Sequence, residues 1–204
     1  MGRTKRSVIK VQDDDSAFRA VVVAQFKDFD GPSVQDWEVM RKNKGNIQSC
    51  FVKLLAKRAG IKMGTIIGIP QWRKIQKALP DYRIVIVDSE CKTNRFFVGP
   101  EDGRRIYIER CGNHYNAITN IKGYMRGSKG QYYCEECNVL YSHRTNHRCS
   151  AICPQCLSAG QCMKYDSIIC SHCEREYNGK QCYDNHIGAT CRIYKKCNNK
   201  NQCL

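Results

Sequence analysis

The chain has 204 residues, a formal net charge of +15, 42% hydrophobic residues and fifteen cysteines. This length accommodates one ordinary domain with a smaller module, and no apolar run of about 18 residues suits a transmembrane helix. The first ten residues also lack the apolar stretch of a secretory signal. We therefore expect an intracellular protein in a reducing compartment without membrane contact, and the basic stretch 3–6 is compatible with the nucleus.

Three segments in the first part of the chain predict helices. Residues 16–29 form a mainly apolar run that ends at Gly31 and Pro32. Residues 46–59 carry an apolar stripe at helical spacing, followed by Gly60 as a C-terminal stop. Residues 69–78 begin with a proline in the first turn, which is a favourable position for it.

The hydrophobic pattern then changes to that of short strands. Four runs rich in β-branched and aromatic residues, separated by turn residues, predict strands at 83–87, 95–98, 105–108 and 115–119. Helices followed by a small sheet indicate an α+β domain over residues 1–126. The glycine-containing stretch 127–130 predicts a boundary, and residues 131–204 form a Cys/His-rich module that needs metal to fold.

Twelve of the fifteen cysteines lie between residues 134 and 203, many of them in C-x-x-C pairs. In a chain without a secretion signal this pattern predicts zinc, about three structural ions, rather than disulfides. The spacing suggests three sites with four ligands each. They are Cys134, Cys137, His147 and Cys149; Cys153, Cys156, Cys170 and Cys173; and Cys182, His186, Cys191 and Cys197.

Some ligands have competitors. His143 has metal spacing relative to His147, and Cys203 competes with Cys197 in the third site. Cys162 and His172 are left outside the sites and are interpreted as structural or exposed side chains. Each predicted site has four protein ligands and no H-E-x-x-H motif occurs, so the zinc is expected to be structural rather than catalytic.

The stretch Asp13-Asp14-Asp15-Ser16 precedes the first predicted helix. Asp15 or Ser16 suits an N-cap, and acidic groups are favourable at the positive end of a helix. A second reading comes from His114, which opens the last predicted strand, with Asn116 two residues on and so on the same strand face. A nucleophile at a helix start, a histidine base and an orienting Asn form a thiol-protease arrangement.

These residues resemble the ovarian-tumour (OTU) family of cysteine proteases and deubiquitinases. The similarity rests on Asp13, on Phe18-Arg19-Ala20 and on His114-Tyr115-Asn116. It implies an OTU-like fold, with Asp13, His114 and Asn116 as catalytic positions and Ser16 in the nucleophile position. Because Ser16 replaces the cysteine, the resemblance implies either an inactive relic or an introduced substitution.

A wider resemblance extends along the chain. An OTU-like block followed by Tyr132-Tyr133-Cys134, His147-x-Cys149 and Cys182-x3-His186 resembles the region before the exonuclease in Maverick/Polinton protein-primed family B DNA polymerases. This similarity implies a role in replicating a mobile or viral DNA element. The chain has no polymerase palm or exonuclease motif, and we expect it to be a fragment of a longer protein.

Three functions follow as hypotheses. The first is a non-catalytic accessory region that contacts DNA or replication proteins. The second is an OTU-type protease that acts on a ubiquitin-like protein and is inactive here because of Ser16. The third is a stand-alone zinc-dependent nucleic-acid or protein adaptor. Because zinc thiolates offset positive charge in the second half, the first half is the expected DNA-contacting part.

Overall fold

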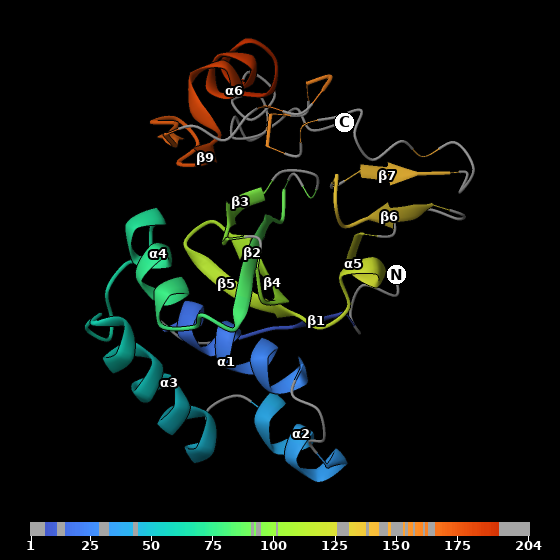
Figure 1. Ribbon diagram of the computed structural model, residues 1–204. Helices are drawn as coiled ribbons and strands as arrows, with labels where there is room; N and C mark the ends of the chain where they lie inside the picture. The colour runs from blue at the N-terminus through green and yellow to red at the C-terminus, as the bar shows by residue number, and fades with distance from the viewer. Residues whose placement is uncertain are drawn as a thin grey trace. The chain divides into compact units, whose positions relative to one another are not determined.

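The fold is that of a computed structural model (Figure 1). It describes residues 7–11, 15–28, 33–42, 45–90, 92, 95–100, 102–125, 131–137, 139–142, 147, 153, 155–156, 158–160, 162 and 166–191. The chain divides into two compact units, one of Met1–Ser89 with Phe97–Tyr124 and one of Glu90–Phe96 with Met125–Leu204. The predicted boundary at 127–130 lies outside the described residues.

The first unit joins helices to a mixed sheet, so the predicted α+β class is confirmed. Its helices are α1 (Ser16–Asp28), α2 (Val34–Arg41), α3 (Asn46–Ala59), α4 (Ile69–Lys77) and α5 (Ile121–Met125). The strands of the sheet are β1 (Val8–Ile9), β2 (Tyr82–Asp88), β3 (Arg95–Val98), β4 (Arg104–Cys111) and β5 (His114–Ile118), in the spatial order β1-β5-β4-β2-β3. The first two residues of β3 are assigned to the second unit. Helices α2 and α5 and strand β1 were not predicted.

The sheet is organised around strand β4. It pairs in parallel with β2 and antiparallel with β5, and β5 in turn pairs antiparallel with β1. A two-residue turn joins β4 to β5, and Gly112 adopts a φ of 62° there, in the left-handed region that glycine tolerates. This short hairpin fixes the register that places Cys111 opposite His114 and Glu109 opposite Asn116.

The core of the first unit lies between the helices and the sheet. Helix α1 contacts both β4 and β5, and its residues 16–24 are all buried. The indole of Trp72 on α4 is fully buried and packs edge-on against Tyr115 of β5, with 5.1 Å between ring centroids. Because α1 is buried through more than two turns, its sequence is a mainly apolar run rather than a narrow apolar stripe.

The described residues of the second unit have little regular structure. They form two short hairpins, β6 (Tyr132–Cys134) with β7 (Val139–Tyr141) and β8 (Ile168–Ile169) with β9 (Glu176–Tyr177). Helix α6 (Gly179–Asn185) continues into a π-helical turn at His186–Thr190. Among the described residues, no helix is long and apolar enough to cross a membrane.

Candidate metal centres and the Ser16 corner

Among the described residues of the second unit, three groups of cysteine and histidine side chains converge, and in each group the ligand atoms lie within 4.8 Å of one another. Site A consists of Cys153, Cys156, Cys162 and Cys182. Site B consists of Cys170, Cys173, His186 and Cys191. Site C consists of Cys134, Cys137 and His147.

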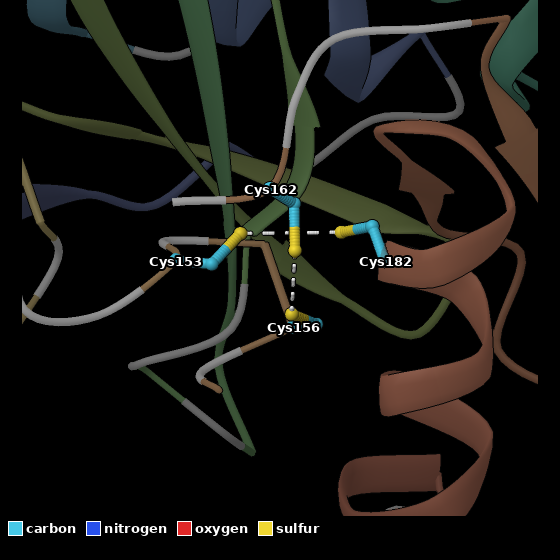
Figure 2. A group of neighbouring side chains, drawn as sticks. All are labelled: Cys153, Cys156, Cys162 and Cys182. Carbon is cyan, nitrogen blue, oxygen red and sulfur yellow. Dashed lines mark hydrogen bonds between the residues drawn. The ribbon is translucent and has the colours of Figure 1, made fainter. Parts of the chain in front are cut away.

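The sulfur atoms of site A surround a common centre (Figure 2). The Sγ atoms of Cys153 and Cys182 are 3.9 Å apart, and those of Cys156 and Cys162 are 3.5 Å apart. Four ligands at about 2.3 Å from a tetrahedral zinc ion have sulfur–sulfur separations of about 3.8 Å. A disulfide would require about 2.05 Å, so the geometry fits a four-cysteine metal site.

Site B has the geometry of a three-cysteine, one-histidine site. The Sγ atoms of Cys170 and Cys191 are 3.9 Å apart, and Cys173 Sγ lies 3.3 Å from Nε2 of His186. A zinc–nitrogen distance of about 2.0 Å gives a sulfur–nitrogen separation near 3.5 Å in a tetrahedral site. All four side chains are buried, and His186 is 0% exposed. The donor set therefore fits zinc and leaves no ligand position open to water.

Local backbone geometry brings these ligands together. After Cys173, Glu174 adopts a φ of 57° and its N–H donates to the carbonyl of Cys170, which closes a tight turn around the C-x-x-C pair. The π-helical turn has a corresponding role for His186 and Cys191. Residues five apart on an α-helix differ by about 140° around the axis, whereas the i→i+5 hydrogen bond of a π turn brings them to nearly the same face.

The electrostatics of sites A and B follow from burial and from close contact between thiols. Burial raises the pKa of Cys173 to about 11, although the charge of the buried Arg175 opposes this. The side-chain hydrogen bond between Cys153 and Cys182 lowers the pKa of Cys153 to about 4 and raises the pKa of Cys182. Without an ion the sulfur atoms therefore cannot all be thiolates, and a divalent cation must displace protons to bind.

Both histidine ligands stack on a tyrosine ring. The ring of Tyr177 lies 4.1 Å from that of His186, and its hydroxyl is 3.8 Å from Cys173 Sγ. In site C, Tyr141 stacks on His147 at 4.3 Å. The Cys-x2-Cys-x3-Tyr spacing that precedes each histidine is the same in both sites. In both sites the stacked tyrosine ring restricts the orientation of the imidazole.

The grouping corrects the partition predicted from spacing. The pairs Cys153/Cys156 and Cys170/Cys173 belong to different sites, and Cys182 is separated from His186 and Cys191. Cys162, left out in the sequence analysis, is a member of site A, while His172 is exposed and outside the three groups. The physical reason is that Cys182 of α6 joins site A, whereas His186 and Cys191, at the two ends of the π-helical turn that follows α6, join site B.

Site C agrees with the sequence prediction in its three described ligands. Cys137 Sγ is 3.4 Å from Nε2 of His147, close to the separation expected around zinc. The predicted fourth ligand, Cys149, lies outside the described residues, as does the competing His143. Cys197 and Cys203, the alternatives for the third predicted site, also lie outside them. Within the described residues, site B already has four ligands without either of these cysteines.

Ser16 begins α1 and is 3% exposed. Its hydroxyl accepts a hydrogen bond from the backbone N–H of Tyr115, at 3.1 Å. The Asp15 carbonyl accepts from Arg19 N–H, but its carboxylate accepts from the N–H of Gly64 at 2.9 Å. Asp15 and Ser16 thus connect the start of α1 to the loop before α4 and to β5.

The other residues of the predicted catalytic arrangement have different hydrogen-bond partners. The side chain of Asn116 accepts from Val11 N–H at 3.0 Å and donates to Glu109 at 2.8 Å, and no bond from it to His114 occurs in the described structure. Because side chains alternate along a strand, His114 and Asn116 lie on the face opposite to Tyr115. Asp13 lies outside the described residues. A catalytic arrangement therefore stays a prediction, while the observed contacts of Ser16 and Asn116 are structural.

Comparison of the chain with protein-family models, curated proteins and solved structures gives no match.

Proposed function

We propose that the chain is a non-catalytic, zinc-stabilised accessory region that contacts DNA, in a protein that replicates a mobile or viral DNA element. The observation that carries the proposal is the pair of four-ligand sets, sites A and B, in which all ligands except the half-buried Cys162 are buried. The polymerase context comes from the sequence resemblance alone. The same closed ligand sets also suit an adaptor without a polymerase.

The closed sites favour a structural role for the metal. A catalytic zinc keeps one position for water or substrate, whereas four protein ligands fill the tetrahedron. The buried cluster around sites A and B consists of Tyr177 and six of their ligands: Cys153, Cys156, Cys170, Cys173, Cys182 and Cys191. Metal ligands thus occupy the place of an apolar core, as expected of a small module that folds when it binds zinc.

DNA is the partner that the charge distribution favours. With zinc bound, site A carries a net charge of about −2 and site B about −1, so the positive excess belongs mainly to the first unit. Helix α4 contributes Arg73, Lys74 and Lys77, all exposed, and contains no acidic residue. Phosphate contacts from such side chains provide sequence-independent affinity.

The test is the salt dependence of binding to a short duplex DNA. We expect affinity to fall steeply with salt, and each of Lys74→Glu and Lys77→Glu to reduce the log–log slope by about 0.9 for a lost phosphate contact. Lys10→Glu is the matched control, because it makes the same charge change at another exposed lysine of the first unit. Absence of binding, or equal loss in all three variants, would refute the DNA-contact proposal.

A further inference from the structure

Helix α3 has one apolar face that is largely uncovered. Ile47, Phe51 and Leu54 are 53%, 47% and 52% exposed, and their spacing places them on one side of the helix. The opposite side of α3 is buried through Val52, Leu55, Ala56 and Ala59. Isolated apolar side chains are common on surfaces, whereas contiguous exposed apolar patches are typical of interaction sites.

A cavity of about 460 Å³ lies beside this face. It is formed within the first unit by Val22 and Phe26 of α1, Met40 of α2, and Phe51, Leu54 and Leu55 of α3, among others. The lining is mainly apolar, and its size falls within the range of ligand pockets, about 300 to 1,000 Å³. Phe51 and Leu54 belong to both the exposed face and the cavity wall.

The cavity is preformed by a buried polar bridge. Gln48 of α3 is 1% exposed, accepts a hydrogen bond from Arg19 of α1 at 2.7 Å, and donates to the carbonyl of Met40 on α2 at 2.9 Å. One side chain thus links the three helices that surround the cavity. A surface held in this way loses little conformational entropy when a partner binds.

We propose that this surface binds an amphipathic helix of a partner protein, with apolar residues facing the cavity and acidic residues at its border. The apolar face extends beyond the cavity, because Ile47 is not among the lining residues and lies about 10 Å before Leu54 along the helix. An elongated occupant with side chains at i, i+4 and i+7 matches this layout better than a compact small molecule.

The basic side chains around the apolar face of α3 indicate that the partner helix has acidic residues at its border. Lys53, Lys57 and Arg58 are exposed on α3, Arg58 also lines the cavity, and α3 contains no acidic residue. A helix bearing Glu or Asp next to its apolar side chains is complementary to this border. A second copy of the same surface would bring two basic α3 helices together, which like-charge repulsion disfavours.

The test uses two stapled helical peptides and the full chain in fluorescence anisotropy. Both peptides carry Leu at i, i+4 and i+7; one has Glu beside these positions and the other has Lys. We expect the Glu peptide to bind at least tenfold more tightly. Leu54→Glu should weaken it at least tenfold, and Lys57→Glu should reduce the preference for Glu over Lys.

Ile66→Glu is the matched control, because Ile66 is 78% exposed and is not among the residues lining the cavity. Circular dichroism and zinc content verify that each variant folds. Equal binding of the two peptides, no binding of either, or equal loss in Leu54→Glu and Ile66→Glu would overturn the proposal. A concentration-dependent dimer that Leu54→Glu dissociates would also overturn it, by identifying a second copy as the occupant.

Discussion

Cys162→Ser tests the assignment of ligands to sites A and B. In the structure Cys162 Sγ lies 3.5 Å from that of Cys156 and completes site A (Figure 2). Partition by C-x-x-C spacing instead leaves Cys162 without a role. The substitution removes one thiolate and changes little else, because the side chain is only half-buried and serine is nearly isosteric.

The expected effect is the loss of one zinc ion from three per chain, the number of ligand groups. Structural zinc contributes about 10 to 16 kcal/mol of apparent binding free energy, which is comparable to the whole stability of an ordinary domain, about 5 to 15 kcal/mol. Among the described residues, Tyr177 is the one non-cysteine member of the buried cluster, and its burial contributes about 1.5 to 3 kcal/mol. Weakening site A should therefore also loosen the hairpin β8–β9 and α6.

The assay is metal content after dialysis against a weak chelator, combined with the absorption of the cobalt-substituted chain. Cys50→Ser is the control, because Cys50 is an exposed cysteine of α3 in the first unit. We expect about three ions for the control and two for Cys162→Ser. Equal metal content in both variants would show that Cys162 is not a ligand and that the grouping is wrong.

Three further predictions concern Ser16 and the metal sites. Ser16→Ala should lower the free energy of urea unfolding by about 1 to 3 kcal/mol, because the buried N–H of Tyr115 loses its acceptor. Ser16→Cys should not react with a ubiquitin electrophile. Labelling of this variant would support the protease hypothesis instead. Zinc affinity should rise with pH through neutrality, because Cys173 and Cys162, with pKa values raised by burial to about 11 and about 12, must lose protons to bind. Calorimetry in buffers of different ionisation enthalpy should detect the release of these protons. A zinc affinity that does not change with pH would contradict the prediction.

Much of the first unit was predictable because its signals are local. The helix boundary at Gly60 follows from its left-handed φ of 63°, and the strands were indicated by β-branched runs close to their observed limits. Helix α2 was missed because only Met40 is buried in it, so its sequence carries no clear apolar stripe. Strand β1 has two residues and depends on pairing with β5, which no local pattern records.

The ligand types of the metal sites were predictable, but their grouping was not. Spacing identifies which cysteines form tight turns, since a C-x-x-C pair is a local feature. Which cysteine pairs share an ion depends on the path of the chain over tens of residues. Cys182 and His186 are only about one helical turn apart, yet they belong to different sites. The same holds for Ser16: its place at a helix start was predictable, but its bond to Tyr115, 99 residues later, was not.

The order of ligands along the chain constrains how the second unit can be made. Site A begins at Cys153 and is completed only by Cys182, after both cysteines of the C-x-x-C pair of site B have been synthesised; site B is completed at Cys191. During translation neither ion can be fully coordinated until nearly the whole segment has left the ribosome. Any truncation between these residues leaves thiols of at least one incomplete site exposed to oxidation or to a wrong metal. Because their ligands are interleaved along the chain, sites A and B can be transferred, duplicated or deleted only together.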